Sequence, residues 1–307
     1  MSLKKIALVG ATGNLGPAIL AALLDAGYEV TILSRERSTS TDSLPSHRNQ
    51  KIAKVNFEDV NSITAALEGI EGVVSNVASH ALLSQKKIID AAITTGVKRF
   101  LPSDFGSDLS IEANKSVPFN TPKVEIHEYL EEKSANHPDF SYTFVYTGPF
   151  FDWSLVFGLF GDLKAHDATL WDGGETRVST TTLSSVGKAV AGVFKNLETT
   201  RNREICIADT TITQKQIIEM VKEIDGKEWT TKTGGTAEAY QLGLDELKKP
   251  EPNMQVVIFN QLYRIIFSDE HGTNMEDKLD NDKVGLSMKT EEQVREVVKN
   301  ALARATM

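Results

Sequence analysis

A glycine-rich segment near the N-terminus constrains the fold most. Residues 10–16 read GATGNLG, between an apolar run at 6–9 and a helical repeat of apolar residues at 15–26. In such a strand–loop–helix unit, the glycines permit a tight turn, close approach of a pyrophosphate and close helix–strand packing. The helix N-terminus adds free N–H groups and a positive partial charge. We therefore predict a dinucleotide phosphate site formed by Gly10, Thr12, Gly13, Asn14, Leu15 and Gly16.

The rest of the first half alternates between short apolar runs and amphipathic segments. We expect further strands at 28–33, 51–55, 73–76, 98–101 and 141–145, with helices at 61–68, 83–95 and 122–135 between them. Strands separated by helices predict right-handed βαβ units and a parallel sheet. The fold class is therefore α/β, a Rossmann-type parallel sheet with helices on both faces and a smaller substrate-binding part.

The second half is less regular. A helix at 183–195 and a strand at 203–208 return to the α/β rhythm, and helices follow at 213–224 and 290–304. The Asp-Gly-Gly at 172–174 predicts a hairpin between two short strands. We expect residues 1–150, rejoined by 183–208, to bind the dinucleotide, and 151–182 with 209–307 to form the substrate-binding part.

Charge and cysteine content exclude several classes of function. The 307 residues carry 33 Lys and Arg against 42 Asp and Glu, a formal net charge of −9, which disfavours nucleic acid as a partner. No apolar stretch is long enough for a membrane span, and no signal-peptide pattern precedes the first strand. The single cysteine, Cys206, can form no internal disulfide, and the six histidines lack metal-ligand spacing. We expect a cytoplasmic protein without a bound metal.

The end of the second strand distinguishes NADP(H) from NAD(H). An NAD site needs an acidic residue there to hold the ribose 2′-hydroxyl. Here Arg35 occupies the tip, and a guanidinium can pair with a 2′-phosphate. Glu36 should point away if Arg35 points inward, whereas Arg37 is either a further contact or a solvated charge. The sequence therefore favours NADP(H).

Ligands of such sheets bind at the carboxyl ends of the strands. We therefore expect the nicotinamide to lie among residues that follow the fourth, fifth and sixth strands, namely Val77, Ala78, Ser103 and Gly148. Aromatic residues also follow these strands. We assign Phe105, Phe150, Phe151 and Trp153 to a pocket for an aromatic substrate, and Phe157 and Phe160 to the core.

Several of these segments resemble the isoflavone reductase-like, NmrA-like branch of atypical short-chain dehydrogenases, most of all its fungal members. The matching pieces are GATGNLG, the strand end at Arg35, VKRFLPSDFGSD at 97–108, YTFVYTGPFFDW at 142–153 and ATLWDGG at 168–174. The resemblance covers most of residues 5–225. It implies either an NADPH-dependent reductase of phenylpropanoid-like compounds or a redox-sensing regulator that binds the dinucleotide without turnover.

The resemblance also implies the catalytic residue. Family enzymes use a lysine in the helix after the PSDFG loop, and Lys123 matches it, so we expect Lys123 to contact the cofactor as well. A helix N-terminus and a cationic nicotinamide both disfavour the ammonium form and lower its pKa, so Lys123 suits a general acid or base. The family places its adenine contacts at Asn56 and Phe57, although Phe57 also fits a core position.

Two alternatives remain open in the sequence. Tyr129 and Lys133 fit the YxxxK pattern of other short-chain dehydrogenases, with Ser103 as the accompanying serine. A non-catalytic sensor of NADP(H) that acts through a protein partner is the second alternative. We favour an NADPH-dependent reductase of a small aromatic or phenylpropanoid-like compound, with Lys123 as general acid or base and His127 as a surface histidine. The substrate's identity, the reaction direction and the oligomeric state are not encoded in any motif.

Overall fold

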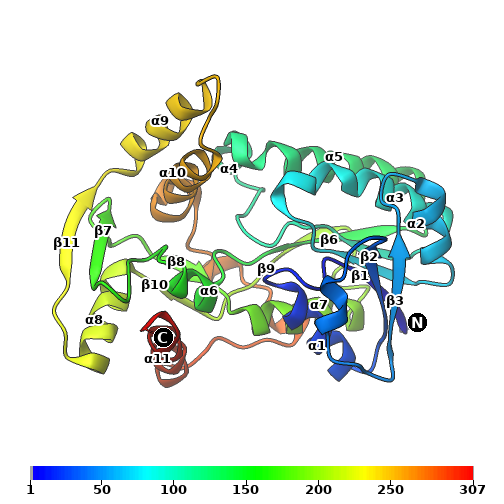
Figure 1. Ribbon diagram of the computed structural model, residues 1–307, viewed down its shortest axis with the longest axis horizontal. Helices are drawn as coiled ribbons and strands as arrows, with labels where there is room; N and C mark the ends of the chain where they lie inside the picture. Colours follow the sequence, from blue (N-terminus) through cyan, green and yellow to red (C-terminus); the bar gives the residue numbers. More distant parts are fainter. Residues whose placement is uncertain (1–2, 307) are drawn as a thin grey trace.

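A seven-stranded parallel sheet forms the centre of the computed structural model, which describes residues 3–306 (Figure 1). Its strand order is β3-β2-β1-β4-β5-β6-β9, and each neighbouring pair is parallel. The strands are β1 (Lys5–Val9), β2 (Glu29–Arg35), β3 (Gln50–Val55), β4 (Gly72–Ser75), β5 (Arg99–Leu101), β6 (Ser141–Tyr146) and β9 (Arg203–Cys206). The order reverses between β1 and β4, which opens a crevice at their carboxyl ends.

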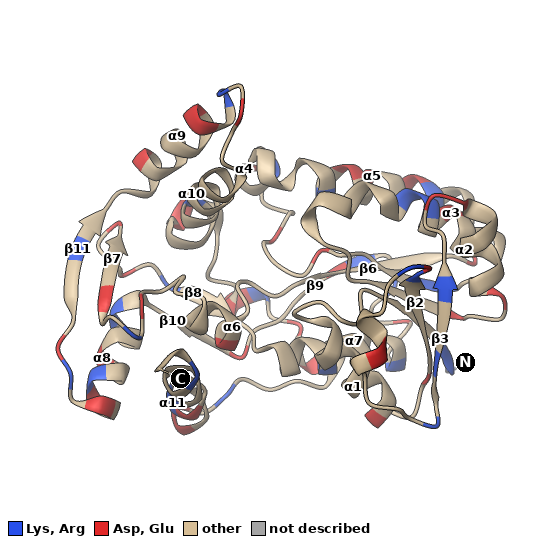
Figure 2. Ribbon diagram, in the orientation of Figure 1, with Lys and Arg blue, Asp and Glu red and all other residues tan. Residues whose placement is uncertain are grey.

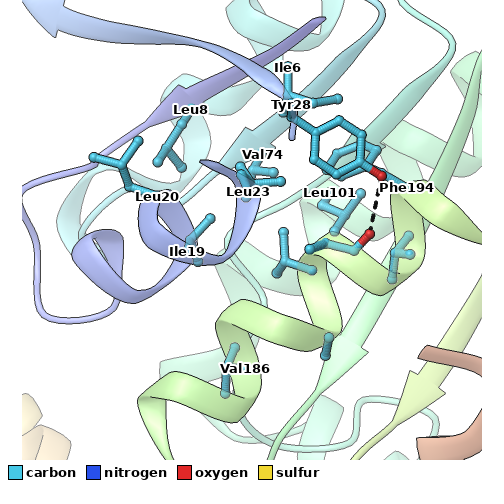
Figure 3. Close-up of a cluster of buried hydrophobic side chains, with 14 of the residues drawn as sticks. Ile6, Leu8, Ile19, Leu20, Leu23, Tyr28, Val74, Leu101, Val186 and Phe194 are labelled. Atoms are coloured by element: carbon cyan, nitrogen blue, oxygen red, sulfur yellow. Dashed lines mark hydrogen bonds between the residues drawn. The ribbon is translucent and has the colours of Figure 1, made fainter. Parts of the chain in front are cut away.

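Helices cover both faces of this sheet, as predicted. Strand residues alternate between the faces, so Ile6 and Leu8 pack in one apolar cluster and Ala7 and Val9 in another. The first cluster lies under α1 (Gly16–Asp25) and α7 (Leu183–Lys195), the second under α2 (Val60–Leu67), α3 (Gln85–Thr94) and α5 (Thr121–Asn136) (Figure 1). In the first cluster, the Tyr28 hydroxyl donates to the Ala191 carbonyl at 3.4 Å (Figure 3).

A smaller part with its own core lies beside the carboxyl edge of the sheet (Figure 1). Its helices are α6 (Phe151–Val156), α8 (Gln214–Asp225), α9 (Thr236–Leu247), α10 (Met254–Phe267) and α11 (Glu291–Thr306). Its strands are β7 (Asp167–Trp171), β8 (Val178–Thr180), β10 (Thr210–Ile212) and β11 (Thr230–Gly234). Short elements complete the fold: η1 (Ser40–Ser43), η2 (Ser79–Ser84), α4 (Glu112–Lys115), η3 (Pro118–Asn120), η4 (Asp269–His271), η5 (Glu276–Lys278) and η6 (Asn281–Val284).

The predicted hairpin around 172–174 is wrong. Strand β7 pairs in parallel with β11, and β8 pairs antiparallel with β10, so the two strands flanking the turn do not pair with each other. The Asp172 carboxylate instead accepts hydrogen bonds from the backbone N–H of Thr236, at 2.9 Å, and from its hydroxyl, at 2.5 Å. This long-range contact fixes the turn against the start of α9.

Residues 183–206 return to the main sheet, where α7 covers one face and β9 pairs with β6. The functional division of the chain into two parts remains a prediction. No helix within 3–306 is long and apolar enough to cross a membrane. Both α5 and α8 carry basic and acidic residues (Figure 2).

Candidate active site

The glycine-rich loop joins β1 to α1 in the geometry that a pyrophosphate requires. Gly10 has φ +80°, and a Cβ atom there would lie 2.0 Å from the Asn76 carbonyl oxygen. A Cβ at Gly16 would lie 2.3 Å from the Gly10 carbonyl oxygen, whereas one at Gly13 would meet nothing closer than 3.6 Å. Gly10 and Gly16 are therefore required by the protein's own packing, whereas a Cβ at Gly13 would make only ordinary van der Waals contacts within the protein.

The same loop presents unpaired backbone donors. Within 3–306, the N–H groups of Asn14 and Leu15 make no hydrogen bond, and no side chain caps α1 at its N-terminus. The Asn76 side chain donates to the Gly10 carbonyl at 3.1 Å and so holds the turn in place. Free donors at a helix N-terminus are an anion site, so these residues fit the phosphates of a dinucleotide.

A cavity of about 550 Å³ continues from this loop across the carboxyl ends of β4, β5 and β6. Of the residues predicted for the site, eleven line it: Gly13, Asn14, Leu15, Val77, Ala78, Ser103, Phe105, Lys123, Gly148, Phe150 and Trp153. The Ser103 hydroxyl donates to the Val77 carbonyl at 2.9 Å, so it ties two strand ends together. The fold thus brings one continuous surface from the phosphate loop to the aromatic residues.

Lys123 lies in the first turn of α5 and reaches into this cavity. Its side chain is 13% exposed, and its Nζ donates to the Asp104 backbone carbonyl at 3.2 Å. Gly106 leaves room for the amine, since a Cβ there would lie 3.4 Å from Nζ. Burial lowers the pKa of Lys123, while the negative charge of Asp104 acts in the opposite direction. The amine can therefore exchange a proton more readily than a lysine in water.

Asp104 and His127 form a buried pair behind this lysine. His127 lies one turn after Lys123 on the same helix face, and its Nε2 is 2.7 Å from Asp104 Oδ2. Its ring stacks on Phe144 at 3.6 Å between centroids. The other carboxylate oxygen, Oδ1, has no hydrogen-bond partner within 3–306 and lies 3.9 Å from Lys123 Nζ. The expectation that His127 is a surface histidine is therefore wrong, because β6 covers its ring.

The alternative pair, Tyr129 and Lys133, lies on a different face of α5. The Tyr129 hydroxyl donates to Asp90 at 2.6 Å, and Lys133 pairs with the same carboxylate at 3.3 Å. Neither residue lines the cavity. This geometry removes the tyrosine-based alternative, because its hydroxyl is bound to α3 and faces away from the strand ends.

The predicted contacts of the adenosine half lie at the β2 and β3 end of the sheet. Arg35 ends β2 with an exposed side chain, and Thr12 donates to Ser40 at 3.2 Å between the loop and η1. Asn56 is exposed after β3, and Phe57 packs partly buried against the core. Neither Asn56 nor Phe57 reaches the cavity, so their role as adenine contacts stays a prediction.

The structure divides the aromatic residues after β6 between the pocket and the core in a different way from the prediction. Phe150 and Trp153 line the cavity, but Phe151 is fully buried in the core of the smaller part and cannot be a pocket residue. Phe157 was expected in the core, yet 49% of it is exposed, stacked between Trp153 and Phe259. Helix α6 ends at Val156, so Phe157 lies beyond the helix and the helical spacing used for the prediction no longer applies to it.

The far end of the cavity is polar, and sequence reasoning missed it. Asp108, Asn114 and His271 line it beside the apolar side chains of α10. His271 Nδ1 lies 2.8 Å from Asn114 Oδ1 across 157 residues of sequence. No local motif marks this contact, because η4 approaches α4 only through the packing of α10. Within 3–306, no cluster of potential ligands could hold a metal ion.

Comparison with known proteins agrees with this geometry. The profile of the NmrA-like family matches residues 2–296. The chain belongs to the NmrA-like family. The NmrA-like assignment confirms the resemblance inferred from the sequence motifs.

Two proteins illustrate what this NmrA-like chain is similar to. The oxidoreductase aprR of Aspergillus flavus is 32% identical over 247 residues, which are 80% of this chain and 82% of that protein. The solved structure "AtPrR2 with NADP+ and (+)pinoresinol" superposes with a TM-score of 0.76 at 21% identity, over 92% of this chain and 93% of that one. The second comparison confirms the α/β fold.

Proposed function

We propose that the protein is a reductase that uses NADPH to reduce a small aromatic, phenylpropanoid-like compound, with Lys123 as its general acid or base. The observation that carries this proposal is the position of the Lys123 amine. It lies in one cavity with the unpaired N–H groups of the phosphate loop at one end and with Phe105, Phe150 and Trp153 along its walls. A buried amine beside a dinucleotide and aromatic walls supports proton transfer coupled to reduction.

The coarser part of this statement follows from the family. The protein is an NADP(H)-dependent oxidoreductase. It belongs to the NmrA-like family, it has an oxidoreductase among its relatives, and it carries an exposed arginine at the end of β2. Pinoresinol in the AtPrR2 structure is a small aromatic compound and supports the substrate class proposed here.

The residues have distinct tasks in this proposal. The N–H groups of Asn14 and Leu15 bind the pyrophosphate, and Arg35 pairs with the 2′-phosphate of the ribose. Val77, Ala78, Ser103 and Gly148 form the wall on which the nicotinamide lies. When bound, NADPH supplies the hydride.

Lys123 moves the proton. Burial lowers its pKa, so the ammonium gives a proton to a developing oxygen anion of the substrate more easily than an exposed lysine does. The Asp104 carbonyl accepts a hydrogen bond from Nζ and holds it in place. The Asp104 carboxylate, which His127 keeps in position, partly stabilises the positive charge of the ammonium. In the reverse direction, the neutral amine accepts the same proton.

The test is consumption of NADPH, followed by its absorbance, with a panel of aromatic aldehydes, ketones and phenylpropanoids. We expect turnover by the wild type and almost none by Lys123→Ala, while both variants bind NADPH with similar affinity. Tight binding of NADPH without turnover of any compound contradicts the reductase and supports the second candidate, a sensor that acts through a protein partner. The observation that favours the sensor is only the family's range of functions, whereas the buried lysine favours the enzyme.

We place the protein in the cytoplasm, because its single thiol, Cys206, is buried and can form no internal disulfide. Burial raises the pKa of Cys206 to about 12, so the thiol stays protonated and takes no part in the proposed chemistry.

A further inference from the structure

The polar end of the cavity contains a histidine whose hydrogen bonds fix its protonation pattern. His271 ends η4, lines the cavity and is only 6% exposed. Among the described residues 3–306, its ring pairs only with Asn114, whose Oδ1 lies 2.8 Å from Nδ1. The question is which of the two imidazole nitrogens carries the proton, because this decides what the cavity can bind there.

The Asn114 side chain answers it. Its Nδ2 donates to two backbone carbonyls, that of Asp108 at 2.7 Å and that of His271 at 3.1 Å. These two contacts use both amide protons, so Oδ1 must be the atom that faces His271. An oxygen only accepts, and therefore the His271 Nδ1 must donate to it. The imidazole carries its proton on Nδ1.

The second nitrogen, Nε2, is then a lone-pair acceptor. It makes no hydrogen bond with any residue of 3–306. Burial and the positive charge of Arg264 lower the pKa of His271, against the opposing charge of Glu270, so the ring is neutral. A bound ligand that carries a hydrogen-bond donor can therefore pair with Nε2 from the cavity that His271 lines.

Two neighbouring polar groups already have partners. The two Asp108 carboxylate oxygens accept from Ser110 and from Lys278. The Thr273 hydroxyl donates to the Arg177 carbonyl at 3.4 Å. Apolar lining comes from Phe119 and from Leu262, Ile265 and Ile266 of α10. His271 Nε2 is therefore an acceptor that a ligand can reach beside apolar walls.

We propose that His271 determines specificity by accepting, through Nε2, a hydrogen bond from a hydroxyl group on the aromatic substrate. The proposal rests on the proposed function only in taking this cavity as the substrate site. A hydroxylated ring satisfies Nε2, whereas its O-methylated counterpart brings no donor and leaves the acceptor unpaired. The cavity therefore selects free hydroxyl compounds over their methyl ethers.

The binding test uses the full chain loaded with NADP+ and two matched probes, 4-propylphenol and 4-propylanisole, in titration calorimetry. We expect the wild type to prefer the phenol by about tenfold, the equivalent of one hydrogen bond. His271→Leu should bind both probes alike, and His271→Gln, which keeps an acceptor, should recover part of the preference. Wild type without any preference, or His271→Leu with the preference intact, overturns the proposal.

A second measurement reads the wild-type protein directly and uses a variant only to assign its signal. Nitrogen-15 NMR of histidine-labelled wild type should show His271 with a protonated Nδ1 and an unprotonated Nε2, and adding the phenol, but not the anisole, should shift the Nε2 resonance. His271→Gln serves only to assign the signal. A proton on Nε2, or equal shifts with both probes, overturns the proposal. Neither measurement depends on turnover, so a failure of NADPH oxidation would count against the reductase and not against this assignment.

Discussion

The two ends of the cavity are built in different ways. The phosphate end consists of consecutive residues, 10–16, whose backbone forms the turn and offers the donors. The substrate end joins residues that are far apart in the sequence, such as Asn114 and His271. Lys123 lies between them, on the helix that follows the fifth strand. The difference indicates that the cofactor end is fixed by local geometry, whereas the substrate end depends on how α10 and η4 pack in the smaller part.

Replacing the lysine between the two ends should separate binding from chemistry. We expect Lys123→Met to lower kcat by about 10²- to 10⁴-fold, the usual contribution of a positioned acid or base. The affinity for NADPH should change less than threefold, because the phosphate loop is untouched. The matched control is Lys133→Met on the same helix, which pairs with Asp90 outside the cavity and should leave kcat unchanged. Equal losses in both variants would contradict the assignment.

Phe151 should stabilise the core of the smaller part and should not contact the substrate. Phe151→Ala removes a fully buried ring and should lower the free energy of unfolding by about 3–5 kcal/mol. The matched change Phe157→Ala, at a ring that is 49% exposed, should cost less than about 1.5 kcal/mol. Denaturant unfolding of both variants measures this difference. Similar losses would mean that the two rings are buried alike.

The contrast between the ends also explains what the sequence could predict. The sheet, the covering helices and the phosphate loop follow from periodicity and from glycine spacing, which are local properties. The helix predicted at 183–195 has these same bounds in α7. The hairpin at 172–174 failed because Asp172 bonds to Thr236, a partner that no local pattern indicates.

The site could be predicted only where a strand end positions it. Lys123 and Ser103 could be predicted because both follow the fifth strand, and because the family resemblance points to the same segment. The burial of His127 could not be predicted, because it results from stacking on Phe144 of a neighbouring strand. The role of His271 could not be predicted, because the apolar residues around it show no regular spacing that would indicate a helix or a strand.

Arg35 should affect the cofactor end alone. If Arg35 pairs with the 2′-phosphate as proposed, Arg35→Ala should remove a charge-assisted hydrogen bond worth about 1.5–3 kcal/mol and weaken NADPH binding by roughly 10- to 150-fold. NADH, which lacks that phosphate, should bind with little change. The control Arg37→Ala should shift NADPH affinity less. Titration of intrinsic fluorescence gives all three constants, and a parallel loss for NADH would refute the phosphate contact.

Asp104→Asn should change the pH dependence and leave the fold intact. The Asp104 charge raises the pKa of Lys123 against the lowering effect of burial, so its removal should lower that pKa further. Reduction needs the protonated amine, and activity should therefore be lost at a lower pH than in the wild type. Asp90→Asn, which affects Tyr129 and Lys133 outside the cavity, should leave the profile unchanged. An unshifted alkaline limb in Asp104→Asn would contradict this role.

The most direct test of the central claim follows the hydride itself. The protein is incubated with the best compound of the panel and with NADPH that carries deuterium at nicotinamide C4. Each C4 stereoisomer is used separately, and the mass of the product is measured by mass spectrometry. We predict one added deuterium from one stereoisomer with the wild type, and almost no product with Lys123→Met. Unlabelled product with both stereoisomers, or labelled product formed equally fast by Lys123→Met, would contradict a reductase in which this lysine moves the proton.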